Sequence, residues 1–131
     1  MTLRNLRFIG VALDCANPEE LSLFYQRLLG ATVLWESDDS VGLRVPGSGV
    51  VLQLMRVDNY QPPTWPESDV PKQMHLDFTA GAALDGPEAR AVELGAQRAD
   101  HQPDPRRWRV LLDPAGHPFC ITTVAPPDLA R

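Results

Sequence analysis

The amino-acid sequence predicts an α+β fold, in which duplicated βαβββ modules form a curved, barrel-like mixed sheet around one cleft. The first observation is an internal repeat: when residues 10–14 are laid on residues 75–79, Leu29-Gly30-Ala31 falls on Leu94-Gly95-Ala96 without a gap. The second is that each copy alternates strand-like segments with one helical segment, and the third is a proline-rich stretch between the copies. A repeat of this kind predicts a pseudo-symmetric fold whose functional residues lie where the two copies face each other.

Chain length and proline content set the expected boundaries. A chain of 131 residues has the size of one compact domain, residues 1–131. Within it we expect module one at about residues 5–57, a linker at 58–73 and module two at about 74–124. The linker contains prolines that neither a helix nor a central strand tolerates: Pro62, Pro63, Pro66 and Pro71.

The first module is expected to begin with a strand and a helix. Apolar, β-prone residues occupy positions 8–15. Asn17 then suits a helix N-cap, Pro18 suits the first helical turn, and Gly30 ends a segment whose apolar residues follow helical spacing. Further strands are expected at residues 31–36, 41–45 and 50–57.

The second module repeats this plan. A strand is expected at residues 74–79, and a helix should begin at Asp85 or Gly86 and end at Gly95. The remaining strands are expected at residues 97–101, 107–112 and 118–124. The last two form a hairpin around Asp113-Pro114-Ala115-Gly116, where every position has turn chemistry.

Strand alternation assigns side chains to the two faces of each sheet. His75 and Asp77 should point into the cleft, while Leu76 and Phe78 should pack under the helix. The repeat relates four cleft positions to one another: Gly10, Gln53, His75 and Cys120.

The duplication and its motifs resemble the vicinal oxygen chelate superfamily, and within it the glyoxalase-like and bleomycin-resistance-like proteins. The motifs are the helix start Asn17-Pro18-Glu19, the two Leu-Gly-Ala endings and the turn from Asp113 to Phe119. The similarity covers roughly residues 5–124. It implies a homodimer and a small-molecule site in the cleft.

The resemblance also implies positions for metal ligands. Metal-dependent members carry one ligand at each of the four cleft positions, usually His, Glu or Gln, His and Glu. Here Gly10 offers no donor, Gln53 offers a weak amide oxygen, His75 matches, and Cys120 replaces the acidic residue. We therefore expect no metal cofactor; if a divalent ion such as Zn, Ni, Mn or Fe binds, its ligands would be His75, Gln53 and Cys120.

Three tryptophans complete the expected site. Trp35 lies at a strand end, Trp65 in the linker and Trp108 at the start of the last hairpin. Such side chains offer flat apolar area to a ligand. The alternative is that they cover the ends of the sheets or form a dimer interface.

The leading functional hypothesis is a small-molecule-binding protein that holds an apolar or aromatic ligand without a metal. His75 would supply the polar contact, Gln53 and Asp77 would orient the ligand, and Cys120 would line the cleft beside the tryptophans. The alternative is a metal-dependent lyase, isomerase or dioxygenase of the glyoxalase type, with His75 as the catalytic candidate. A His75–Cys120 nucleophile and base pair, or a scaffold protein with a vestigial cleft, would be further alternatives.

Charge and cysteine usage bound partners and location. The net charge of −5 argues against a nucleic-acid or anionic-membrane partner. No apolar run approaches about 18 residues, the length of a membrane span. The two cysteines, Cys15 and Cys120, suit a reducing compartment, so we expect a cytoplasmic protein.

Overall fold

The structure is a computed structural model that describes residues 5–124. The helices and strands of this part follow in chain order: β1 (Gly10–Cys15), α1 (Pro18–Leu29), β2 (Thr32–Glu36), β3 (Ser40–Arg44), β4 (Val51–Arg56), β5 (Leu76–Thr79), α2 (Asp85–Leu94), β6 (Gln97–Arg98), β7 (Trp108–Leu112) and β8 (Pro118–Thr122).

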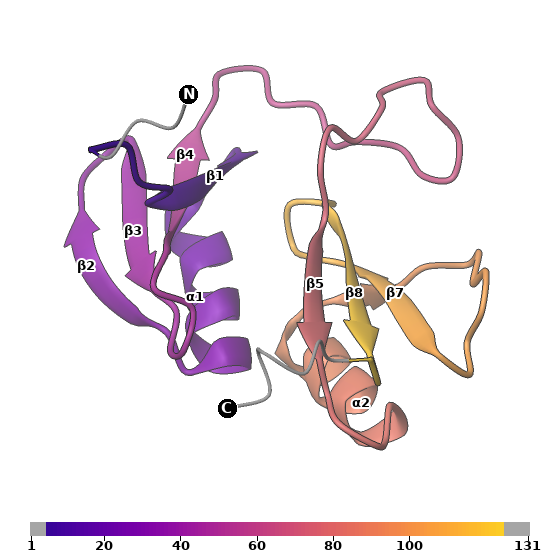
Figure 1. Ribbon diagram of the computed structural model, residues 1–131. Helices are drawn as coiled ribbons and strands as arrows, with labels where there is room; N and C mark the ends of the chain where they lie inside the picture. Colours follow the sequence, from indigo (N-terminus) through magenta and orange to yellow (C-terminus); the bar gives the residue numbers. More distant parts are fainter. Residues whose placement is uncertain (1–4, 125–131) are drawn as a thin grey trace. The chain divides into compact units, whose positions relative to one another are not determined.

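The chain forms two compact units, of which the first ends at Tyr60 and the second begins at Gln61. Each unit contains one helix and one four-stranded mixed sheet, in the order β1-β4-β3-β2 and β5-β8-β7-β6 (Figure 1). The predicted α+β class and the duplicated βαβββ plan are therefore confirmed, with two open sheets that are not closed into a barrel. The division falls within the expected linker, residues 58–73; the single-domain assignment stays a prediction.

The two sheets share one pairing scheme, which is the structural form of the sequence repeat. The first strand of each unit runs parallel to the last, and Ala12 pairs with Gln53 as Asp77 pairs with Cys120. The third strand of each unit then runs antiparallel to the last. Repeat-related residues therefore occupy equivalent places on equivalent faces.

Helix α1 forms for the reasons read from its sequence. The Asn17 side chain accepts a hydrogen bond from the Glu20 backbone N–H at 3.1 Å, and Gly30 ends the helix with φ 69°. One helical face is buried against β3 and β4. The fully buried side chains of this face are Leu21, Phe24 and Tyr25.

Helix α2 begins at Asp85, one of the two expected positions, and has no side-chain hydrogen bond at its N-cap. Ion pairs to the sheet tie its first turn instead. Arg109 of β7 contacts Asp85 Oδ1 and Glu88 Oε2, both at 3.0 Å, and Arg98 contacts the other Glu88 oxygen at 2.7 Å. A helix with little buried apolar area is thus held to its sheet by charge.

Four strands are at least two residues shorter at one end than predicted, and one of them is β8, which ends at Thr122 rather than at residue 124. Strand β1 begins at Gly10 rather than Phe8, and β5 begins at Leu76, so His75 directly precedes its strand. Strand β6 ends at Arg98 rather than at His101. The Gln102 side chain explains this end, because its amide donates to the Val110 carbonyl at 2.8 Å and accepts from the Val110 N–H at 2.9 Å. The Gln102 side chain thus makes the hydrogen bonds to the Val110 backbone that a longer β6 strand would otherwise have made.

In the part of the chain described here, neither helix has the length and apolar character needed to cross a membrane.

Candidate functional site

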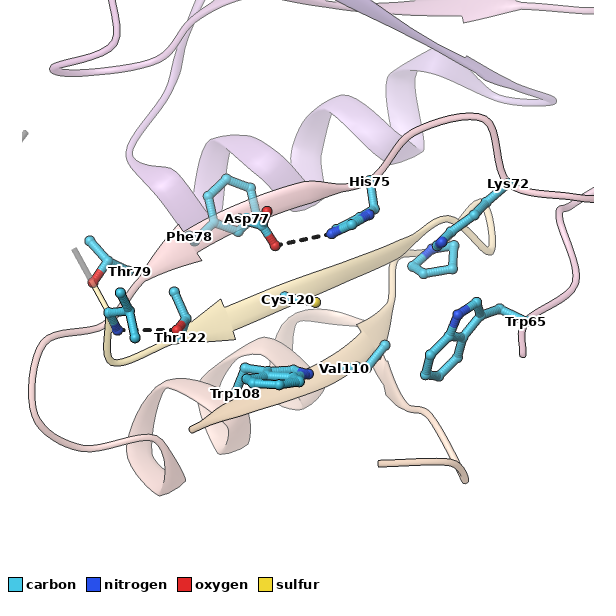
Figure 2. A pocket seen from close by; sticks show the side chains of 12 residues that line it. Trp65, Lys72, His75, Asp77, Phe78, Thr79, Trp108, Val110, Cys120 and Thr122 are labelled. Atoms are coloured by element: carbon cyan, nitrogen blue, oxygen red, sulfur yellow. Dashed lines mark hydrogen bonds and ion pairs between the residues drawn. The ribbon is translucent and has the colours of Figure 1, made fainter. Parts of the chain in front are cut away.

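A pocket of about 670 Å³ lies on the face of the second sheet that is turned away from its buried core (Figure 2). All of its lining residues belong to the second unit. The apolar part of the lining includes Trp65, Trp108, Val110 and Pro118, and its polar part includes Lys72, His75, Asp77 and Cys120. A concave, mostly apolar site with a few convergent polar groups is the usual form of a small-molecule site.

Strand alternation and register place the polar side chains together. Asp77 of β5 is the parallel register partner of Cys120 in β8, so their side chains lie next to each other on one face. His75 precedes β5 by one residue and reaches the same place. On the opposite face, Phe119 and Ile121 are buried in the core, as alternation predicts.

The hairpin turn keeps β7 and β8 in register. Asp113 is 4% exposed, and its Oδ1 accepts hydrogen bonds from the backbone N–H groups of Ala115 and His117, both at 2.9 Å. Gly116 follows with φ 89°, a conformation that other residues rarely adopt. The turn thereby fixes where Cys120 enters the pocket.

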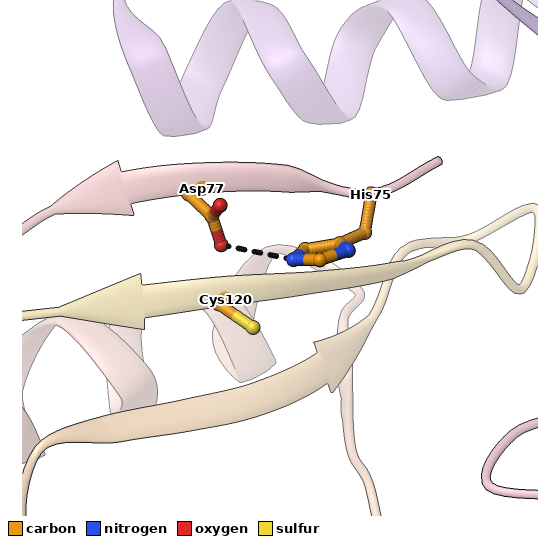
Figure 3. Close-up of side chains that lie close together, drawn as sticks. All are labelled: His75, Asp77 and Cys120. Atoms are coloured by element: carbon orange, nitrogen blue, oxygen red, sulfur yellow. Dashed lines mark ion pairs between the residues drawn. The ribbon is translucent and has the colours of Figure 1, made fainter. Parts of the chain in front are cut away.

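His75, Asp77 and Cys120 form one cluster (Figure 3). His75 Nε2 lies 3.3 Å from Asp77 Oδ1. The pKa of the Cys120 thiol is raised from 9.0 to about 11, chiefly by burial and in addition by the charge of the Asp77 carboxylate and a hydrogen bond to it, while the Lys72 ammonium acts in the opposite direction. The thiol is therefore protonated at neutral pH, which disfavours the nucleophile and base pair because the thiolate is the reactive form.

The cluster has the composition of a metal site. One ligand atom from each of His75, Asp77 and Cys120 lies within 4.8 Å of the others. Imidazole, carboxylate and thiolate donors together suit zinc better than hard ions such as Mn²⁺, which prefer carboxylate and other oxygen ligands. The residues thus fit a zinc-like ion, with Asp77 as the third donor within the second unit. Gln53, the expected third ligand, belongs to the first unit and stays a prediction.

The first unit carries the other expected site residues on its own sheet. Gln53 pairs with Gly42 of β3 and lies on the same face. The Trp35 ring covers Gly42, where a Cβ would come within 2.4 Å of the ring carbons, and Trp35 Nε1 donates to Ser40 Oγ at 3.2 Å. Gly10 has no room for a side chain, because its Cβ would lie 2.7 Å from the Val51 carbonyl oxygen.

Of the predicted site residues, the pocket brings together Trp65, His75, Asp77, Trp108 and Cys120. Phe78 also borders this pocket, although alternation assigned it to the core alone; its ring packs edge-on against Phe119. Sequence reasoning missed Lys72, which lies in the expected linker. The signal that could have identified it is that Lys72 is the chain's only lysine.

The loop before β5 positions Trp65. Thr64 pairs with Pro71 as an isolated bridge, and its N–H donates to the Val70 carbonyl at 2.7 Å. The Thr64 hydroxyl also accepts from the Val70 N–H at 3.0 Å. Trp65 follows this closure directly, and its ring lies 5.3 Å from that of His101 between centroids.

Comparison with solved structures finds the same fold in several proteins. A variant of the fosfomycin resistance protein FosX from Listeria monocytogenes, complexed with Mn(II) and 1S,2S-dihydroxypropylphosphonic acid, superposes with a TM-score of 0.69 at 18% identity, over 95% of this chain and 93% of that one. FosX from Mesorhizobium loti gives 0.67 at 16% identity, over 99% and 100%. A glyoxalase/bleomycin resistance protein/dioxygenase family enzyme from Burkholderia phytofirmans PsJN gives 0.64 at 18% identity, over 86% and 94%. These identities establish a common fold alone.

Family comparison is more specific. Among curated proteins, none matches the chain. A family model described as a glyoxalase-like domain matches residues 10–122, which include every helix and strand described above. The chain therefore belongs to the glyoxalase-like domain family, within the vicinal oxygen chelate superfamily.

Proposed function

We propose that this protein binds a small apolar or aromatic molecule in the pocket of its second unit. The observation that carries the proposal is the pocket itself, which combines two tryptophan side chains with a short polar strip. This strip consists of the side chains of Lys72, His75, Asp77 and Cys120. Its volume of about 670 Å³ falls within the range of small-molecule sites. Trp65 and Trp108 would form the walls, and His75, Asp77 and Cys120 would orient the ligand. Gln53 and Trp35 remain proposed contributors from the first unit.

A neutral fluorescent probe tests this function. N-phenyl-1-naphthylamine gains emission in apolar sites, and saturable one-to-one binding is expected. Trp108→Ala removes one wall of the pocket and should weaken binding by about tenfold, because an aromatic contact contributes about 1 kcal/mol. The matched control is Val92→Ala, since Val92 is an exposed apolar residue of α2 outside the pocket. Absence of saturable binding, or equal loss in both variants, would overturn the proposal.

A second candidate is a metal-dependent enzyme, and the specific observation favouring it is the three-donor cluster. The FosX relative complexed with Mn(II) supports metal use in this fold. A bound divalent ion would supply Lewis-acid polarisation of a substrate oxygen. His75, Asp77 and Cys120 would hold it, and Cys120 would lose its proton on binding.

Metal titration distinguishes this candidate from metal-free binding. Zn²⁺ should raise the melting temperature, release protons, and bind at least tenfold more tightly than Mn²⁺ because of the thiolate donor, an effect of about 1.4 kcal/mol. His75→Ala should abolish the shift. Arg106→Gln in the same unit, outside the pocket, serves as the control. If neither ion shifts the melting temperature, the enzyme candidate loses its support.

The homodimer and the cytoplasmic location stay predictions. Sedimentation equilibrium of the purified chain checks the first, and fractionation of cells that express it checks the second.

A further inference from the structure

Lys72 gives the pocket a charged group that the proposed function does not yet use. It lies one residue after Pro71, the bridge partner of Thr64, and its side chain lines the pocket between His75 and Trp65 in the view of Figure 2. Lys72 is the only lysine of the chain, and the other residues that are cationic at neutral pH are arginines. The bridge between Thr64 and Pro71 therefore positions both the indole ring of Trp65 and the ammonium group of Lys72 at the pocket.

The ammonium group is not neutralised by its neighbours. Within residues 5–124, Lys72 forms no ion pair or hydrogen bond, whereas the pocket's carboxylate, Asp77, lies against His75. The Lys72 charge nevertheless reaches into the pocket, since it lowers the pKa of the Cys120 thiol against the larger effects that raise it. An unpaired ammonium beside apolar walls is a ready partner for an anion.

The remaining donors point to the same chemistry. The indole N–H groups of Trp65 and Trp108 meet no hydrogen-bond acceptor in the described part of the chain. The pocket thus offers an ammonium and two indole donors, while its one carboxylate is already engaged. A ligand that satisfies them must bring acceptor oxygens together with a flat apolar body.

We propose that the ligand is an aromatic carboxylate or a comparable planar anion, whose ring lies against the tryptophans and whose charged oxygens pair with Lys72. This inference rests on the proposed small-molecule function and names the class of its ligand. Asp77 would disfavour an anion at its own end of the polar strip, so the anionic group lies at the Lys72 end.

Three probes that share the naphthalene ring system and differ in charge test the inference by calorimetry at neutral pH. They are 2-naphthoate, 2-naphthalenemethanol and 2-naphthylmethylammonium, which are anionic, neutral and cationic. In the wild type, the acid should bind about tenfold more tightly than the alcohol, as one charge-assisted hydrogen bond predicts. The amine should bind most weakly.

Variants then assign the preference to one side chain. Lys72→Gln should leave the acid and the alcohol with equal affinity, and Lys72→Arg should restore part of the difference. Arg106→Gln removes one positive charge from the same unit outside the pocket and should keep the full preference. A preference that survives in Lys72→Gln overturns the inference.

A measurement on the wild type alone guards against misfolded variants. Lys72 carries the only side-chain amine, so sulfosuccinimidyl acetate should modify it and the N-terminal amine only. Saturating 2-naphthoate should slow acetylation of Lys72 at least fivefold and leave the N-terminus unaffected. Equal binding of all three probes would overturn the anion inference and leave the pocket function standing, whereas no binding by any probe would overturn both.

Discussion

Replacing Asp77 by asparagine should make the Cys120 thiol react faster with an alkylating reagent. Burial is the largest cause of the raised pKa of Cys120, and the Asp77 carboxylate adds to it through its charge and a hydrogen bond. Asparagine keeps the size of the side chain and removes the charge. Burial and the opposing Lys72 ammonium remain, so the pKa should fall part of the way toward its ordinary value.

The pKa of the thiol sets the size of the effect. At pH 8, a pKa of about 11 leaves about one thiol in a thousand ionised, and a full return to 9.0 would raise this fraction about a hundredfold. Because Asp77 supplies only part of the shift, Asp77→Asn should accelerate alkylation by about tenfold. Lys72→Gln should act in the opposite direction, since it removes the one charge that lowers the pKa of Cys120.

Iodoacetamide labelling followed by peptide mass spectrometry measures this rate between pH 7 and 10 in a chelating buffer. Cys120→Ser is the control, because the remaining Cys15 is only 1% exposed and should stay unlabelled. An unchanged or slower rate in Asp77→Asn would refute the reasoning, since it would mean that the carboxylate does not act on the thiol.

The other expected outcomes concern stability, each measured by urea unfolding. Gly42→Val should cost about 1–3 kcal/mol and shift tryptophan emission, because the new side chain displaces the Trp35 ring. Asp113→Ala should cost about 2–3 kcal/mol by removing the acceptor of two turn N–H groups. Arg109→Met should cost about 1–2 kcal/mol, since it breaks the largely buried ion pair between Arg109 and Glu88 of α2. The raised pKa of Cys120 stabilises the folded state below pH 9.0, and this stabilisation should disappear as the pH rises through about 11; Cys120→Ala should lack this alkaline loss.

The sequence repeat and strand alternation predicted which strand residues of the second unit face the pocket. The alignment of the two copies places Cys120 in a closing strand, and alternation places Asp77 on the same face, which the register confirms. Choosing the third donor by the family's positions selected Gln53. Within the second unit, the third donor beside His75 and Cys120 is Asp77, which follows from strand register and needs no family pattern.

The conformation of the loops could not be predicted from the sequence pattern. Residues 58–73 show prolines without periodicity, so nothing indicated that Thr64 closes a loop that presents Trp65 and Lys72 together. The early end of β6 has the same cause, because the Gln102 amide replaces backbone partners by a contact that no periodicity encodes. Hydrogen bonds from single side chains decide both features.

The repeat also shows why the two copies differ in chemistry although their backbones agree. His75 has Gly10 as its counterpart, and Gly10 meets the Val51 carbonyl so closely that a Cβ would lie 2.7 Å from it. A histidine at that position would therefore displace the backbone between β1 and β4 before it could act as a ligand. Restoring a donor to the first copy would therefore require this backbone to shift. Among the described residues of the second unit, the donor atoms that lie together are those of His75, Asp77 and Cys120, which come from the residue before β5, from β5 and from β8.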